Sequence, residues 1–318
     1  MDALFRTLTT LFMGLMAAVG IQVGPSTWQL HTMPDGRSVA LTFSDHPHSS
    51  HGATIAIEEF DGLKALLTSN GPARFRLKRD AGVFEFDGVL RGGSGGGTME
   101  FMPNATFADE LARRGFERPA RIDQYKMAWH NTGFAFIDEL AAQKYQRPTL
   151  SQLVDAGDHG IDRAYVSDLA AAGYRFGTVD ALIRQHDHGV DAAFVRDLAA
   201  LDQKGLSADD LVRARDHGVS PVYVRDLRSL GYRLSLDELV TARDHGVSPD
   251  YIRDLNALGY RGVALPDLVR LRDHGVNPPW LQVVNERNRG TLSVDQLVSL
   301  RDHGVETLDE LRRRTHTS

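Results

Sequence analysis

After its first 25 residues, the chain contains short segments in which apolar and polar residues alternate. Clear examples are residues 73–79 and 83–90. Alternation at period 2 is typical of a strand that buries one face. Two further strand-like segments, 28–31 and 38–43, lie on either side of a Pro-Asp-Gly turn sequence at 34–36. The pattern predicts a small antiparallel β-domain over residues 26–105, with one face of the sheet in water.

From residue 106 onward the apolar residues follow helical spacing, and the sequence repeats itself. The tripeptide Asp-His-Gly occurs six times, and successive copies lie 28 or 29 residues apart. A fixed period of about 20–50 residues indicates stacked units that cannot bury their apolar faces alone. The six copies are Asp158-His159-Gly160, Asp187-His188-Gly189, Asp216-His217-Gly218, Asp244-His245-Gly246, Asp273-His274-Gly275 and Asp302-His303-Gly304.

Each unit carries start and stop signals for two helices. Ser235 and Glu238 form a capping box for the first helix, and Gly246 supplies the left-handed residue that ends it. Ser248 followed by proline starts the second helix, and Gly259 ends it. Such short helices need tertiary packing to persist. We therefore expect residues 106–318 to form an α-solenoid, which makes the chain an α+β protein. Further capping boxes are expected at Thr149 with Gln152, Ser293 with Gln296 and Thr307 with Glu310, and Asn288 is expected to replace the second glycine in one unit.

The array opens irregularly. Residues 107–116 match the second helix of a unit, as at 165–174, so the array is expected to begin with half a unit. Trp129-His130-Asn131 then stands where a full unit has Asp-His-Gly. Counting this degenerate unit, we expect about seven two-helix repeats.

The aspartate of each Asp-His-Gly corner stands at a helix end where its negative charge is unfavourable, so a partner must stabilise it. Histidine in the last turn suits the negative end of the helix dipole, whereas aspartate does not. We expect each aspartate to accept hydrogen bonds from amides of the next helix or from an arginine of a neighbouring unit. Adjacent Asp and His side chains point about 100° apart on a helix, which disfavours a metal site in each unit. The candidate arginines precede their aspartates at Arg215, Arg243, Arg272 and Arg301.

Composition and charge narrow the function classes. The chain is 42% apolar and 25% charged, as in soluble globular proteins. Residues 1–118 hold 11 basic and 13 acidic side chains, and residues 119–318 hold 25 and 29. Neither part has the basic stripe of a nucleic-acid-binding protein. The absence of cysteine excludes disulfides, thiolate zinc sites and cysteine nucleophiles.

The N-terminus has the pattern of a secretory signal peptide. An apolar run at 11–19 follows Arg6, and Ala18 and Gly20 give a small-x-small arrangement, although Asp2 weakens the positive n-region. The run is short for a spanning helix, which needs about 20 apolar residues. The alternatives are an uncleaved anchor and a cytosolic helix. We expect residues 1–25 to be a signal peptide or membrane anchor, with 7–23 as the tether, and the protein to be exported, periplasmic or membrane-anchored.

Three other patterns resemble functional sites. His46, His48 and His51 could bind zinc, nickel or copper, but their spacing matches no zinc signature, and the serines and proline around them favour a solvated loop. Residues 92–96 satisfy the nucleophile-elbow pattern G-x-S-x-G, but a strand-like segment follows instead of a helix, so a flexible hairpin connection is expected. An aromatic row recurs at the repeat period and is expected in the core, because an acidic array does not attract nucleic acid. This row is Tyr165, Phe194, Tyr223, Tyr251 and Trp280.

The unit at 239–255, Leu-Val-Thr-Ala-Arg-Asp-His-Gly-Val-Ser-Pro-Asp-Tyr-Ile-Arg-Asp-Leu, resembles a bacterial helical-repeat family whose biochemistry is largely uncharacterised. Similar repeats occur in exported proteins and in the C-terminal regions of antirepressor-type metallopeptidases and anti-sigma regulators. The segments 79–86 and 98–103 also look like the domain that precedes such repeats, so the resemblance covers roughly residues 27–314. This chain has no His-Glu-x-x-His motif and no cysteine, so neither peptidase activity nor a zinc-binding anti-sigma domain is implied.

These patterns predict a non-catalytic protein that uses a helical-repeat surface to bind a protein partner, as a scaffold or a sensor module. No catalytic residue, cofactor or nucleic-acid partner is expected. The alternative is a metal-binding protein or enzyme with its site at His46, His48 and His51. Metal analysis of the purified protein and of a His48→Ala variant distinguishes the two hypotheses.

Overall fold

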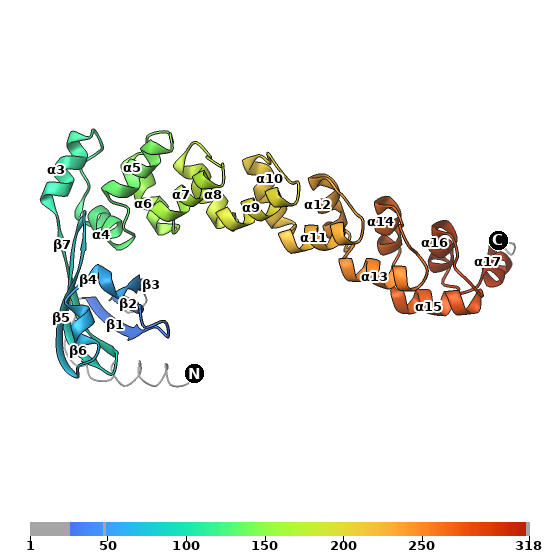
Figure 1. Ribbon diagram of the computed structural model, residues 1–318, viewed down its shortest axis with the longest axis horizontal. Coiled ribbons are helices and arrows are strands. Elements are labelled where there is room, and N and C mark those ends of the chain that lie inside the picture. Colours follow the sequence, from blue (N-terminus) through green and yellow to red (C-terminus); the bar gives the residue numbers. More distant parts are fainter. Residues whose placement is uncertain (1–25, 47–48, 316–318) are drawn as a thin grey trace. The chain divides into compact units, whose positions relative to one another are not determined.

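The computed structural model describes residues 26–46 and 49–315 (Figure 1). The predicted signal peptide or anchor, residues 1–25, lies outside this range, as does His48. The chain divides after Trp129 into two compact units, which we call the sheet unit and the repeat unit. Among the described residues, no helix is both long and apolar enough to cross a membrane.

The sheet unit contains one curled antiparallel sheet of seven strands, which confirms the predicted β-domain (Figure 1). The strand order is β3-β2-β1-β7-β6-β5-β4. The predicted turn joins β1 to β2, where the Asp35 side chain accepts hydrogen bonds from the amides of Arg37 and Ser38. The strands are β1 (Ser26–Thr32), β2 (Ser38–His46), β3 (Ser49–Ala56), β4 (Phe60–Asp61), β5 (Gly71–Arg79), β6 (Gly82–Arg91) and β7 (Ser94–Pro103), with the short helices η1 (Ile57–Glu59) and α2 (Leu63–Leu66) on either side of β4.

The buried face of this sheet is rich in aromatic residues. Trp28 on β1 is 1% exposed and packs edge-on against Phe75 and Phe86, at centroid distances of 5.2 and 6.0 Å. Phe75 and Phe86 face each other across β5 and β6 and stack at 4.7 Å. The period-2 alternation in the sequence therefore places these rings on one side of the sheet.

Besides η1 and α2, the sheet unit contains two longer helices: α3 (Ala105–Arg113) and α4 (Arg121–Trp129). Helix α4 packs on β5, β6 and β7. Trp129 at its end lies edge-on to Phe43, with the ring centroids 4.4 Å apart. The compact unit therefore extends beyond the predicted limit of residue 105, because the first helix of the degenerate repeat supplies aromatic side chains to the sheet's core.

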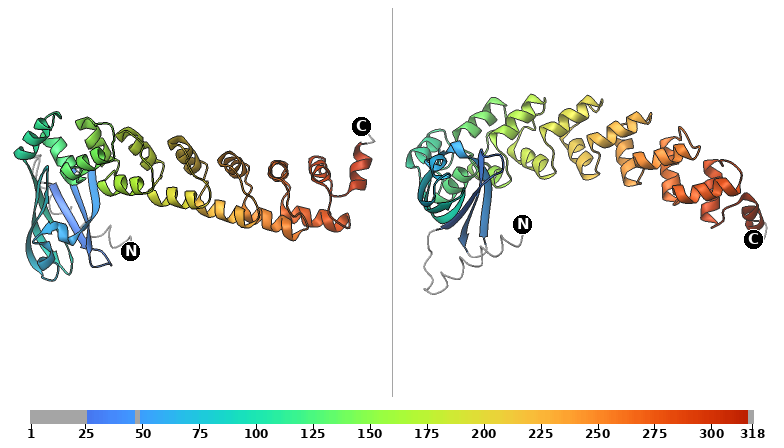
Figure 2. Two further views of the ribbon diagram at one scale, coloured as in Figure 1. Left: turned by 45° about the horizontal axis from the view of Figure 1, so that its top comes forward. Right: turned by 60° about the horizontal axis from the view of Figure 1, so that its bottom comes forward.

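The repeat unit is a series of short helices arranged as two rows, as the views of Figure 2 show. We call the first helix of each repeat the A helix and the second the B helix. Helix α5 (Phe134–Ala142) is the B helix of the degenerate repeat. The six repeats that follow are α6 (Leu150–Asp158) and α7 (Arg163–Ala171); α8 (Val179–Asp187) and α9 (Ala192–Ala200); α10 (Ala208–Asp216) and α11 (Pro221–Ser229); α12 (Leu236–Asp244) and α13 (Pro249–Ala257); α14 (Leu265–Asp273) and α15 (Pro278–Arg287); α16 (Val294–Asp302) and α17 (Leu308–Thr315). Successive A helices from α6 to α16 pack on one another, successive B helices from α5 to α15 do the same, and α17 packs on α16.

The helix ends follow the sequence signals with one exception. The capping boxes predicted at Thr149, Ser235, Ser293 and Thr307 are all formed. The prediction that Asn288 is the left-handed residue after α15 is wrong. Helix α15 is ten residues long, and the left-handed position passes to Arg289, at φ 57°. The Asn288 side chain instead donates to the Glu306 carbonyl and accepts from the Leu308 amide, which ties α15 to the start of α17.

Candidate functional site

Each Asp-His-Gly copy forms the corner at the end of an A helix. The aspartate is the last helical residue, the histidine is the C-cap, and the glycine is left-handed, with φ between 62° and 76°. This geometry is expected where a helix ends at a glycine, because a side chain at positive φ is strained. At Gly246 an added Cβ would also lie 3.0 Å from the Arg272 side chain of the next repeat. The corners are therefore places where neighbouring repeats meet.

The histidine of each corner contacts the aspartate of the next corner. His217 Nδ1 lies 2.7 Å from Asp244 Oδ1, and His245 Nδ1 lies 2.6 Å from Asp273 Oδ1. In the tautomer that satisfies both groups, the ring N–H donates to the carboxylate. We call this row of contacts the His–Asp ladder. Its other pairs are His130–Asp158 at 3.2 Å, His159–Asp187 at 3.0 Å, His188–Asp216 at 2.6 Å and His274–Asp302 at 2.7 Å.

The ladder corrects the expected partner of the aspartates, which is a histidine of the preceding repeat instead of an arginine or a helix amide. Four of the six aspartates directly follow an arginine, and each of these arginines stacks on the aromatic ring of the preceding repeat. The guanidinium carbon of Arg243 lies 4.7 Å from the Tyr223 ring centroid, and that of Arg272 lies 4.9 Å from Tyr251. A cation over an aromatic face is attracted by the ring quadrupole. The remaining stacks are Arg215 on Phe194 at 3.8 Å and Arg301 on Trp280 at 5.2 Å.

The aromatic row lies at the joints between repeats. Phe194, Tyr223 and Tyr251 are 3–4% exposed, as expected for core residues. The hydroxyls of Tyr223 and Tyr251 donate to the carbonyls of Val247 and Val276 in the next repeat, at 2.8 and 2.9 Å. Burial raises the pKa of both phenols to about 12. Tyr165 makes the equivalent bond to Val190 at 2.7 Å. Three residues of the row are therefore core residues, as expected, whereas Tyr165 and Trp280 are only half-buried.

The contacts of Trp129, His130 and Asn131 explain why this first copy of the Asp-His-Gly tripeptide is degenerate. Trp129 stands in the aspartate position and packs into the core of the sheet unit. Asn131 takes the glycine position with a left-handed φ of 55°. Gly157 leaves room for the ring of His130, since a Cβ there would lie 2.7 Å from His130 Cβ. At the other end, His303 Nδ1 contacts the Ser299 carbonyl of its own helix.

A second row of ion pairs joins the last turn of one A helix to the first turn of the next A helix. Arg213 Nη1 lies 2.5 Å from Asp237 Oδ1 of the next repeat. Arg184 pairs with Asp209 in the same way, and Arg270 with Asp295. The carboxylates are 79–81% exposed, so each pair contributes little to stability.

The predicted histidine loop is largely a hairpin. His46 ends β2 and His51 lies in β3, where it is paired with Phe43. His48 lies outside the described residues, and the side chains of this segment carry no further structural statement. Within residues 26–46 and 49–315, no three His, Asp or Glu side chains are placed to hold a metal ion. Each rung of the ladder brings together one imidazole and one carboxylate.

The glycine run at 92–96 is only partly a turn. Gly92 and Gly93 form the left-handed turn between β6 and β7, at φ 55° and 79°. Ser94, Gly95 and Gly96 already belong to β7, between β6 and β1. A Cβ on Gly95 would lie 2.1 Å from the Val89 carbonyl oxygen, so the strands approach too closely for a side chain. The segment is therefore strand structure and lacks the helix that a nucleophile elbow requires.

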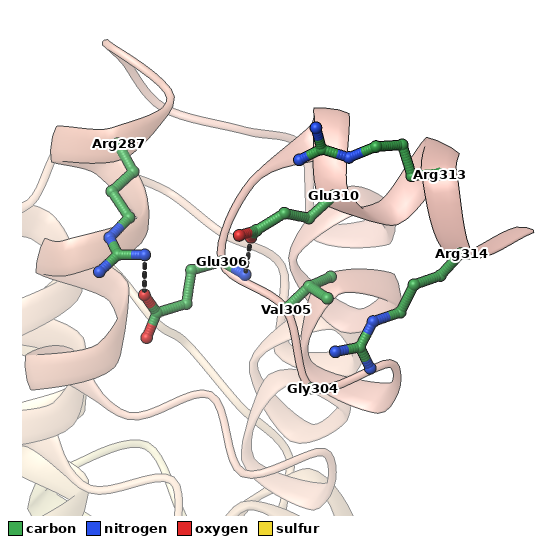
Figure 3. Close-up of a pocket in the computed structure, with 7 residues that line it drawn as sticks. All are labelled: Arg287, Gly304, Val305, Glu306, Glu310, Arg313 and Arg314. Atoms are coloured by element: carbon green, nitrogen blue, oxygen red, sulfur yellow. Dashed lines mark hydrogen bonds and ion pairs between the residues drawn. The ribbon is translucent and has the colours of Figure 1, made fainter.

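A cleft of about 300 Å³ lies at the C-terminal end of the repeat unit (Figure 3). Arg287 Nη1 and Glu306 Oε2 form an ion pair at 2.8 Å across it. Glu310 accepts the amides of Glu306 and Thr307, and these bonds lower the pKa of its carboxyl. Arg314 donates to the His303 carbonyl at 2.7 Å. The charged groups of this cleft thus have structural partners in the last repeat.

Sequence reasoning missed the ladder, although the signal was present. In a stack with a fixed period, corresponding corners of adjacent repeats lie side by side. The histidine of one corner and the aspartate of the next are 27 or 28 residues apart in the sequence. A histidine after each aspartate is therefore placed beside the aspartate of the next copy.

Comparisons of the chain with protein-family models, curated proteins and solved structures found no match.

Proposed function

We propose that this chain is a non-catalytic scaffold or sensor module that binds a protein partner through the surface of its helical repeats. The observation that carries this proposal is the kind of contact that the repeated residues make. The Asp, His, Arg and aromatic residues that recur along the array mostly make contacts between neighbouring repeats. Recurrence thus has a structural cause, which supports a binding array over a row of catalytic sites.

The outer face of the B helices is the best candidate for the binding surface. Two positions on this face lie three residues apart, on one side of each helix, and their residues are exposed except for Ser167, which is half-buried. Their residues differ from repeat to repeat in size and charge, as a surface selected for one partner requires. In order along the array, the pairs are Ala164 and Ser167, Ala193 and Arg196, Val222 and Arg225, Asp250 and Arg253, and Pro279 and Gln282.

Val222 makes this face testable, because it is 54% exposed and leaves much of its apolar side chain in water. Large exposed apolar side chains contribute to stability mainly when a partner covers them. The paired variant Val222→Asp with Arg225→Glu alters the face and leaves the joints intact. Val89→Asp on β6 is a matched control, since Val89 is 44% exposed in the sheet unit.

The test uses the full chain immobilised as bait in an extract of the cells that express it. We expect one protein to be retained at a fixed ratio by the wild type and by Val89→Asp, and to be lost from the paired variant. Retention that is equal for all three proteins contradicts the proposed surface. Binding of nucleic acid that weakens steeply with added salt would point to a different function.

We also propose export, on the strength of the apolar run at 11–19 and the small residues that follow it. Mass spectrometry of the mature N-terminus tests this proposal. A chain that retains Met1 in the cytosolic fraction contradicts it.

A further inference from the structure

Five joints connect the six full repeats, and two of them have no tyrosine at the ring position: the joint between the second and third repeats, with Phe194, and the last joint, with Trp280. Of these two, the joint between the second and third repeats is the one where the described residues also include buried polar atoms without partners. At three joints a tyrosine hydroxyl donates to a valine carbonyl of the next repeat, from Tyr165, Tyr223 and Tyr251. At the joint of α8 and α9 with α10 and α11, this position is Phe194, which has no hydroxyl. Arg215 still stacks on the ring of Phe194 at 3.8 Å. The joint therefore keeps the stack and lacks the hydrogen bond.

Two buried polar atoms at this joint lack hydrogen-bond partners. Gln185 is 1% exposed; its amide nitrogen donates to the Ala208 carbonyl, but its Oε1 has no partner. Other A helices have alanine or leucine at this position, such as Ala214 and Leu271. Arg215 Nε is also buried without a partner. A buried polar atom without a partner loses its hydration without compensation.

The chain between these two repeats departs from the pattern as well. Asp202 occupies the left-handed position after α9, at φ 60°, where α7, α11 and α13 are followed by a glycine; α5 and α15 also have a non-glycine residue there, Lys144 and Arg289. Gln203 follows in place of the tyrosine found at Tyr232, and its side-chain amide donates to the Leu234 carbonyl of the third repeat at 3.1 Å, so this bond across the joint is kept. The bonds that remain across this joint include exposed ones, since the Asp202 carboxylate that pairs with Arg228 is 68% exposed. Exposed ion pairs stabilise weakly.

We infer that this joint is a built-in weak point that divides the repeat unit into two blocks, residues 130–206 and 207–315, which open and unfold separately. In a repeat protein, stability is the sum of the repeats and of the contacts between nearest neighbours. Partial unfolding therefore stops at the weakest contact. The inference concerns the mechanics of the array and does not depend on the proposed function.

The experiment is hydrogen exchange of the full chain, read by mass spectrometry in sub-denaturing urea. We expect the helices on the two sides of residues 201–206 to differ roughly tenfold in exchange rate, with a step at that boundary. Exchange of all repeat helices as one unit overturns the inference, and so does a step at another joint.

Two variants test the cause. Phe194→Tyr with Gln185→Leu supplies the hydroxyl and removes the unpaired oxygen, and we expect the step to shrink or vanish. A step that persists unchanged in this well-folded variant contradicts the inference. Tyr223→Phe is the reverse control and removes the hydroxyl at the next joint. It should weaken protection between the third and fourth repeats, and unaltered protection there contradicts the role given to the hydroxyl even if the repair variant fails to fold.

Discussion

The sheet unit and the repeat unit build their cores from contacts of different range. In the sheet unit, Trp28 packs on Phe75 and Phe86, which lie far from it along the chain. In the repeat unit, the contacts that recur join residues about one repeat apart, such as Tyr223 with Val247. A change in the sheet unit should therefore act on the whole unit. A change in the repeat unit should act mainly on the nearest repeats.

The largest effect is expected from Trp28→Ala. Trp28 is 1% exposed, packs against two phenylalanines, and donates its indole N–H to the Asp87 carbonyl. Its removal should lower the free energy of unfolding of the sheet unit by about 3–5 kcal/mol. Urea unfolding followed by hydrogen exchange measures this loss. Helices α12 to α15 should keep their protection, and an equal loss there contradicts the comparison.

Alkaline pH should destabilise the repeat unit through its buried tyrosines. Burial raises the pKa of Tyr223 and Tyr251 in the folded state to about 12, from the ordinary value of 10.0. The contribution of these phenols to stability is fully present below pH 10 and is lost as the pH rises toward and beyond 12. Tyrosinate absorbance and helical circular dichroism should change together in that range. Complete ionisation near pH 10 with the helices intact contradicts this account.

Gly246→Ala should destabilise one corner by about 1–2 kcal/mol, because alanine at φ 69° is strained. The exchange rates of α12, α13 and α14 should rise, while those of α6 and α7 stay as in the wild type. Ala242→Gly, a buried helical position without positive φ, is a control for the general cost of altering this repeat. A Gly246→Ala variant as stable as the wild type would show that the corner tolerates a side chain.

Tyr251→Phe should cost about 1 kcal/mol, the net value of one buried hydrogen bond. The ring and its stack with Arg272 remain, so only the bond to the Val276 carbonyl is lost. Differential scanning calorimetry of the two proteins measures the change. Since Trp280 has no hydroxyl at the same position, Trp280→Phe separates loss of ring area from loss of the bond.

The repeat architecture could be predicted from the sequence because its signals are local. Ser235, Glu238 and Gly246 act through bonds within one helix or turn, and the structure confirms each of them. Contacts between repeats were harder to predict from the sequence, because the aspartate of each corner has several possible partners nearby. Electrostatic reasoning favoured the adjacent arginine, but the aromatic ring of the preceding repeat holds the arginine, and the histidine faces the carboxylate.

In the sheet unit the sequence predicted the strands but not their order or the place of α4. Strand order depends on contacts between distant segments, such as β1 with β7, that no short pattern encodes. The role of the glycines in β7 could not be predicted from the sequence for the same reason. Gly95 lies where the Val89 carbonyl leaves no space for a side chain, which is visible only once β6 and β7 are paired. The sequence alone indicates a flexible connection there.

The His–Asp ladder is the central claim, and a double-mutant cycle on His217 and Asp244 tests it most directly. These side chains are 39% and 46% exposed, and the two atoms in contact lie 2.7 Å apart. The cycle compares His217→Ala, Asp244→Asn and the double variant in urea unfolding. We expect a coupling energy of about 0.2–1 kcal/mol, the range for exposed pairs. His303→Ala with Asp244→Asn is the matched control and should show none. Additive effects for His217 and Asp244 would contradict the ladder as a link between repeats.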